Sequence, residues 1–125
     1  MRERRKYPRY DILAQIRVRR GRVNHIMAVK DISLSGLFIS ADSAQELAAF
    51  RVDQEIEMDI FTPEALENVR VMGRIVRVSD RQESGELGFG VEFTEIDETN
   101  LREIARLVDI AARASISPPP LPSGS

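Results

Sequence analysis

The chain contains no cysteine, no tryptophan and a single histidine, His25. The absence of cysteine excludes disulfides and thiolate chemistry, and one histidine offers no histidine pair or cluster, so we expect no metal site. No apolar run approaches the ~18 residues that span a membrane, and no hydrophobic segment follows Met1, which predicts the absence of a secretory signal. The sequence therefore predicts a cytoplasmic protein that does not insert into membranes.

Patterns of catalytic residues are missing as well. Acidic residues are numerous, but no two of them form a recognisable acid/base pair. A triad of His25, Asp31 and Ser33 would need a geometry that neighbouring strand residues rarely form. Gly88 and Gly90 lack the third glycine and the following helix of a dinucleotide-binding loop, so they predict a strand packed closely on a neighbour. We expect no enzyme, no catalytic residues and no cofactor.

The charge is balanced in total but not in distribution. The net charge is −2, yet residues 1–22 hold nine arginines and lysines against Glu3 and Asp11. This segment carries +7, and the remaining 103 residues carry −9. Such asymmetry indicates either an anionic partner at one end of the molecule or a solvated basic tail. A small anion fits better than a nucleic acid, because the acidic remainder would repel a long polyanion.

Alternation of apolar and polar residues with a period of two indicates half-buried strands in six segments. These segments are 12–19, 26–32, 37–40, 54–61, 69–78 and 87–93. Within 69–78 the alternation breaks at Met72 and Gly73, which predicts a bulge or a bend. Six short strands in a chain of 125 residues predict a mainly β fold, a small six-stranded antiparallel barrel around a single core.

After the last strand, the apolar period changes to that of a helix over residues 97–113. The expected apolar face consists of Leu101, Ile104, Ala105, Val108 and Ala111. Asp97 suits the N-cap position, and this helix would cover one opening or side of the barrel. Segment 43–50 has weak helical character. Residues 114–125 are rich in proline, serine and glycine, which predicts a disordered tail.

Two polar motifs stand outside this pattern. RKYPR lies in a basic arm, residues 1–10, and places Arg5 and Arg9 four positions apart. DISLSG begins at Asp31 and joins a carboxylate, a hydroxyl and a glycine just before a strand. Taken separately, such arginines are ordinary on a surface, and the second motif is typical of a turn whose side chains bond the local backbone. Taken together, the motifs favour a site for a guanine nucleotide, because arginine and aspartate match opposite edges of guanine.

This combination, R-x-x-x-R followed by D-x-S-x-x-G, resembles the PilZ family, whose members bind the bacterial second messenger cyclic di-GMP. The similarity covers about residues 4–110 and includes the later segments VRVMGRIVRV and GFGVEF. It implies a six-stranded barrel with a following helix, here within residues 11–113 and preceded by the arm. It also implies that a bound ligand changes the arm and the surface that a protein partner reads.

The resemblance implies six ligand-binding residues, which are Arg4, Arg5, Arg9, Asp31, Ser33 and Gly36. An arginine can bond the O6 and N7 acceptors of guanine, or a phosphate, with two hydrogen bonds. Asp31 can accept from the N1–H and N2 donors of guanine, and the Ser33 hydroxyl can donate or accept. Gly36 would keep the turn shape and let backbone approach the ligand. Members of the family with arginine at the position of Arg4 tend to bind a stacked pair, so we expect two ligands per chain.

The sequence thus predicts a cyclic di-GMP receptor that regulates motility or exopolysaccharide through a protein partner. Two alternatives stay open: a PilZ-like interaction module that acts without nucleotide and, less favoured, a small-barrel nucleic-acid-binding protein. Binders of single-stranded nucleic acid stack bases on exposed aromatic residues. The chain has seven aromatic residues, and most of them, such as Phe38, Phe61 and Phe93, fall in predicted strands.

Overall fold

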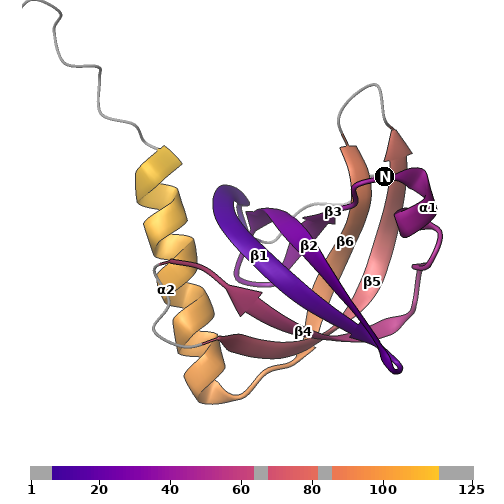
Figure 1. The fold of residues 1–125 in the computed structure, drawn as a ribbon. Helices are drawn as coiled ribbons and strands as arrows, with labels where there is room; N and C mark the ends of the chain where they lie inside the picture. Colours follow the sequence, from indigo (N-terminus) through magenta and orange to yellow (C-terminus); the bar gives the residue numbers. More distant parts are fainter. Residues whose placement is uncertain (1–6, 64–67, 82–85, 116–125) are drawn as a thin grey trace, which may run out of the picture.

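The computed structural model of the protein describes residues 7–63, 68–81 and 86–115. Over these residues the chain forms, in order, β1 (Tyr10–Arg20), β2 (Val23–Ile32), β3 (Gly36–Ser40), α1 (Ala44–Leu47), β4 (Glu55–Phe61), β5 (Val69–Arg81), β6 (Glu86–Glu95) and α2 (Glu98–Ser115). Neighbouring strands are antiparallel and close into a barrel in the order β1-β2-β3-β6-β5-β4. The predicted six-stranded antiparallel barrel is confirmed (Figure 1).

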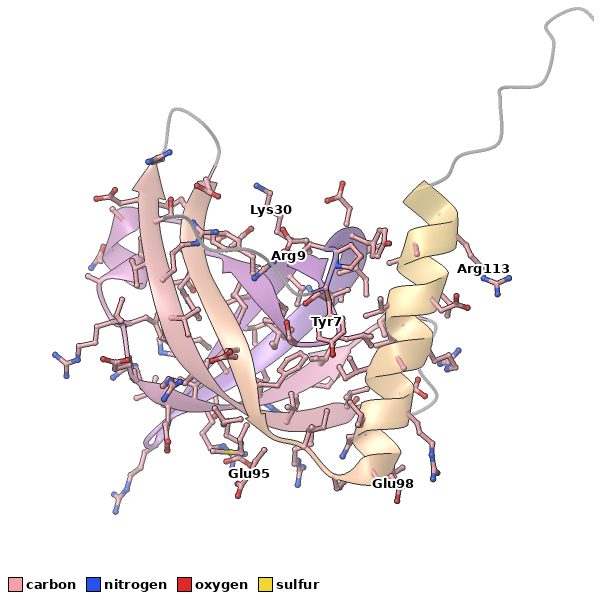
Figure 2. All side chains as sticks on the ribbon, turned by 180° about the vertical axis from the view of Figure 1, so that it is seen from behind. Tyr7, Arg9, Lys30, Glu95, Glu98 and Arg113 are labelled. Atoms are coloured by element: carbon pink, nitrogen blue, oxygen red, sulfur yellow. The ribbon has the colours of Figure 1, made fainter. Side chains whose placement is uncertain are left out.

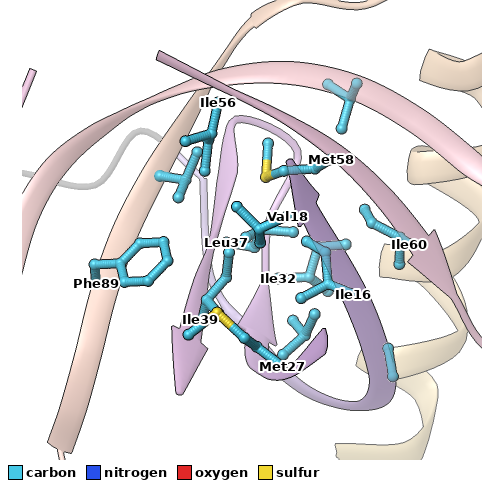
Figure 3. Close-up of a cluster of buried hydrophobic side chains, with 14 of the residues drawn as sticks. Ile16, Val18, Met27, Ile32, Leu37, Ile39, Ile56, Met58, Ile60 and Phe89 are labelled. Atoms are coloured by element: carbon cyan, nitrogen blue, oxygen red, sulfur yellow. The ribbon is translucent and has the colours of Figure 1, made fainter. Parts of the chain in front are cut away.

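The barrel interior is filled by the inward-facing residues of all six strands. In β1, for example, Ala14, Ile16 and Val18 are buried and alternate with more exposed residues. The centre of the core contains Ile16, Val18, Met27, Ile32, Leu37, Ile39, Ile56, Met58, Ile60 and Phe89 (Figure 3). Burying an aliphatic or aromatic side chain of this size contributes about 1.5–3 kcal/mol. The core therefore specifies the register of each strand, and the register decides which residues face outward.

Helix α2 packs against β1 and β5 through a face that differs in part from the predicted one. Ile104, Leu107 and Ala111 are buried, whereas Leu101 is 43% exposed and Ala105 is exposed. The predicted face was wrong at these two positions, because the helix turns Leu107 rather than Leu101 toward the barrel. The N-cap is confirmed, since the Asn100 N–H donates to Asp97 Oδ1 at 2.8 Å. Neither described helix is long and apolar enough to cross a membrane.

The segment around α1 lies on the other side of the barrel from α2 (Figure 1). Helix α1 is a single turn, in keeping with the weak helical character of 43–50, and Ser43 caps it by accepting from the Glu46 N–H. Phe50 follows the turn, is buried and stacks on Phe89 at 4.5 Å between ring centroids. The ring of His25 meets Phe50 edge-on at 4.9 Å. The single histidine is therefore a packing residue of this side of the barrel.

Candidate ligand-binding site

The DISLSG motif forms a tight turn between β2 and β3, and Ser33 holds it together. The Ser33 side chain accepts from the N–H groups of Ser35 at 3.1 Å and Gly36 at 3.2 Å. The Ser33 N–H donates to the Gly36 carbonyl at 2.8 Å, and the residue is only 1% exposed. The hydroxyl predicted to meet the ligand therefore bonds the backbone of its own turn, which is the alternative that such a motif leaves open.

Gly36 is required by the neighbouring strand. A Cβ added at this position would lie 2.1 Å from the carbonyl oxygen of Val91 in β6. Gly36 opposes Glu92 in the β3–β6 ladder, and its backbone φ is not in the left-handed region. The glycine of the motif thus allows β3 and β6 to approach closely, and this contact fixes the position of the turn before β3 relative to β6.

The structure places Arg9 directly against Asp31, two residues that the sequence assigns to one ligand site. Arg9 Nη1 donates to Asp31 Oδ1 at 3.0 Å, and each side chain is 21% exposed. Arg9 (Figure 2) lies just before β1, whose first residue, Tyr10, opposes Ile32 at the end of β2. Arg4 and Arg5, the other predicted arginines, lie outside the described residues.

A bulge in β2 places two consecutive residues on the outside of the barrel. The pairing with β3 shifts between Val29 and Asp31. Val29 and Ile32 belong to the core, whereas Lys30 is exposed and Asp31 is half-buried. A second shift between Ile75 and Arg77 does the same in β5, where Val76 and Arg77 are both exposed. The two bulges thus place Lys30 of β2 and Arg77 of β5 on the outer wall, one on each side of the β3–β6 pair.

Four residues form a row across this wall, which we call the outer row: Asp31, Phe38, Gly90 and Arg77. They oppose one another in register along β2, β3, β6 and β5. Phe38 is 2% exposed but lies outside the core cluster. Arg77 Cζ is 5.1 Å and Lys30 Nζ 5.7 Å from the centre of its ring, within the range of cation–π attraction.

The two glycines of β6 differ in what surrounds them. A Cβ on Gly88 would lie 2.0 Å from the Ile39 carbonyl oxygen, so the predicted close packing on a neighbouring strand is confirmed there. A Cβ on Gly90 would meet nothing nearer than 3.9 Å, at Arg77 and Phe38. Gly90 is itself buried, so the absence of a side chain there lets Arg77 lie close to the wall and over the Phe38 ring.

Glu86 partly balances the cations of this face. It accepts from the Ser79 hydroxyl at 3.2 Å and lies 3.5 Å from Arg77 Nη2. Burial alone would raise the pKa of Glu86, but the Ser79 hydrogen bond and the positive charges of Arg77 and Lys30 outweigh burial and lower the pKa. Glu86 thus stays ionised at neutral pH and pairs with Arg77 of the outer row.

Lys30, Phe38 and Arg77 were not among the predicted site residues. The bulge in β2 leaves a trace in the sequence, because V-K-D-I holds two residues between inward-facing ones where a regular strand holds one. That trace does not show that β2 and β5 flank the same β3–β6 pair. The strand order, which places β6 between β3 and β5, is needed to bring these residues together.

The fold and this face define a small closed β-barrel module with a charged site on its outer wall. The sequence matches the profile of the PilZ domain over residues 3–109, and the chain therefore belongs to the PilZ domain family. A search of curated proteins finds no match.

Two solved structures share the fold. The inhibitor of motility MotI/DgrA of Bacillus subtilis superposes with a TM-score of 0.70 and 18% identity over 91% of this chain and 52% of that protein, so the chain spans about half its length. The PilZ domain of YcgR from Escherichia coli, determined with c-di-GMP, superposes with a TM-score of 0.67 and 12% identity. That match covers 90% of this chain and 95% of the YcgR domain. Identities this low establish the shared fold alone.

Proposed function

We propose that this chain is a cytoplasmic cyclic di-GMP receptor that signals ligand binding to a protein partner. The observation that carries the proposal is the Arg9–Asp31 pair, at the Asp31 end of the outer row of a PilZ barrel. The similar YcgR domain was determined with c-di-GMP, and the similar B. subtilis protein is an inhibitor of motility. Motility is therefore the first output to test, with exopolysaccharide regulation as the second.

The chemistry of the face suits a guanine nucleotide. The guanidinium of Arg9 presents a planar fork that matches O6 and N7 of guanine or two phosphate oxygens. Asp31 uses one oxygen for Arg9, which leaves acceptor capacity for the N1–H and N2 donors of a guanine. Lys30 and Arg77 supply positive charge for phosphates, and both lie over the Phe38 ring. Ser33 and Gly36 contribute by holding the turn after Asp31.

The arm supplies the remaining contacts in this proposal. Arg5 would pair with Arg9 on guanine edges and phosphates, and Arg4 would offset the extra charge of a second, stacked ligand. We therefore expect two ligands per chain. Ligand binding would order the arm and change the surface beside Arg9, and amide exchange over residues 3–10 should slow when cyclic di-GMP is added. A stoichiometry of one, unchanged by Arg4→Leu, would assign Arg4 no such role.

Calorimetry separates this function from its alternatives. Cyclic di-GMP should bind, whereas cyclic di-AMP should bind at least a hundredfold more weakly, because adenine places an amino donor at the O6 position and lacks the donors for Asp31. Equal affinity for the two would overturn the guanine-specific site. No binding of either would favour a module that acts without nucleotide, and binding of a single-stranded oligonucleotide alone would favour a nucleic-acid-binding protein. Recovery of cyclic di-GMP unchanged after incubation would support a receptor without enzyme activity.

A further inference from the structure

A hollow of about 430 Å³ opens where β6 leaves the sheet. Strand β5 begins at Val69, but its pairing with β6 begins only at Met72, opposite Glu95. Beyond Glu95 the chain turns through Ile96 and Asp97 into α2, and β5 from Val69 to Val71 has no β6 partner. Asn100 of α2 reaches across, and its Oδ1 accepts from the Arg70 N–H at 3.3 Å. We call the hollow between this end of β5 and the start of α2 the β5–α2 groove.

The floor of the groove is apolar and its two walls carry carboxylates. Glu57, Met72 and Glu95 oppose one another in register across β4, β5 and β6, which sets the Met72 side chain between two glutamates. Met72 is half-buried on the outside, whereas Met58 lies in the core. Methionine is a flexible apolar side chain that adapts to varied partners. Ile96 extends this floor and Asp97 adds a third carboxylate to the rim.

The positive charge near the groove is already matched. Arg70, the one guanidinium that lines the described groove, donates to Asp59 at 3.0 Å, and this hydrogen bond and charge raise the pKa of Arg70. Arg19 lies 3.7 Å from Glu57 in a pair exposed to solvent, which attracts only weakly. Figure 2 shows Glu95 and Glu98 at the end of the barrel away from Arg9 and Lys30. The groove is therefore anionic and lies apart from the cationic ligand face.

We propose that the β5–α2 groove is the docking site for a lysine- or arginine-bearing segment of the protein partner. Such a side chain has an aliphatic stem that fits over Met72 and Ile96, and its charged head would sit between Glu57 and Glu95. An acidic segment would meet like charges at the rim, and an uncharged apolar one would add no counter-charge beyond the weak Arg19–Glu57 pair. This inference deepens the proposed function and rests on it only for the existence of a partner.

The test uses the full chain and a fluorescein-labelled twelve-residue peptide of alternating lysine and leucine, with a glutamate–leucine peptide as its control. Anisotropy should show binding of the basic peptide only, weakened at least fivefold by Glu57→Gln combined with Glu95→Gln, and by Met72→Ala. The matched control is Glu55→Gln, which removes an exposed carboxylate from the same strand as Glu57 but outside the groove lining and should leave binding unchanged. Amide shifts induced by the peptide should centre on residues 70–72 and 95–97.

The contrary outcomes are distinct. Absence of peptide binding up to millimolar concentration, equal weakening by Glu55→Gln, or amide shifts centred on Asp31 would each overturn the proposal. Self-association of the chain that the same groove variants abolish would overturn it in favour of a second copy's basic arm. The groove variants should bind cyclic di-GMP with the affinity of the unaltered chain, as measured by calorimetry. Failure of the groove proposal and failure of the receptor proposal therefore give different results. Thermal melting of each variant excludes loss of fold.

Discussion

Asp31 and Asp59 are two carboxylates on the outer wall of the same barrel, and their surroundings differ. Asp59 accepts from Arg17 at 3.3 and 3.0 Å and from Arg70 at 3.0 Å, and its side chain is 6% exposed. Both arginines oppose it directly in register, one on β1 and one on β5. Asp31 accepts from a single atom of Arg9, outside the sheet, and is 21% exposed.

The difference teaches how one ion pair can serve structure and another can serve binding. Both oxygens of Asp59 are used by side chains whose positions the strand register sets, so a ligand could not reach them without breaking the sheet surface. Asp31 keeps acceptor capacity and solvent access, and its partner comes from a segment that precedes β1. A carboxylate whose one partner lies outside the sheet can exchange it for a ligand donor at little loss, because one charge-assisted hydrogen bond replaces another.

The largest expected effect is on ligand binding at Asp31. Asp31→Ala should weaken cyclic di-GMP binding about a hundredfold, because it removes the acceptor of two guanine donors, each charge-assisted bond contributing ~1.5–3 kcal/mol. Calorimetry measures the change, and Asp59→Ala should stay within about threefold of the unaltered chain. Comparable losses in the two variants would break the comparison, because Asp59 would then act on the ligand as strongly as Asp31.

The converse effect is on stability at Asp59. Asp59→Ala should lower the free energy of unfolding by about 2 kcal/mol, because three hydrogen bonds from Arg17 and Arg70 to a carboxylate only 6% exposed are lost. Asp31→Ala should lower it by less than about 1 kcal/mol, since only one hydrogen bond, from Arg9 to a carboxylate that is 21% exposed, is lost. Urea unfolding followed by circular dichroism checks both values. If Asp31→Ala proves the more destabilising, the Arg9 pair belongs to the structural frame of the barrel.

Sequence reasoning reached the barrel more fully than the site. Alternation in strands such as β1 follows directly from burial on one face, so the six strands could be predicted from periodicity. The same reasoning predicted the bulge at Met72 and Gly73, which the register confirms. It failed at Leu101, because a helical face drawn from a sequence does not show how the helix rotates against the barrel.

The site was predictable only where a local motif carries it. Arg9 and Asp31 lie in recognisable motifs, and the structure brings them to 3.0 Å. Phe38 and Arg77 meet through a long-range strand order, in which β6 pairs with β3 although three elements lie between them along the chain. Periodicity describes each strand alone and contains no information about such pairing.

A smaller effect on binding is expected at Arg9. Arg9→Ala should weaken cyclic di-GMP binding about tenfold, which corresponds to one charge-assisted bond. Arg17→Ala, which removes an arginine from the Asp59 pair, is the matched control and should leave affinity unchanged. Arg9→Lys distinguishes a phosphate contact from a guanine contact. Compared with Arg9→Ala, it should keep part of the affinity if Arg9 binds a phosphate, and little if Arg9 binds guanine with two hydrogen bonds. Full affinity in Arg9→Ala would remove Arg9 from the site.

The smallest effect on ligand affinity is expected at Ser33, whose hydroxyl is hydrogen-bonded to the backbone of its own turn. Ser33→Ala should lower the free energy of unfolding by about 1 kcal/mol, because the N–H groups of Ser35 and Gly36 lose their acceptor. Binding should weaken only about threefold, through a looser turn after Asp31. Ser35→Ala is the control, because its hydroxyl is half-buried and, among the described residues, hydrogen-bonds only to the Ser33 hydroxyl, at 3.3 Å. A tenfold loss of affinity in Ser33→Ala with unchanged stability would instead mean that the hydroxyl leaves the turn to bond the ligand. Ligand binding would then rearrange the turn after Asp31 as well as the Arg9–Asp31 ion pair.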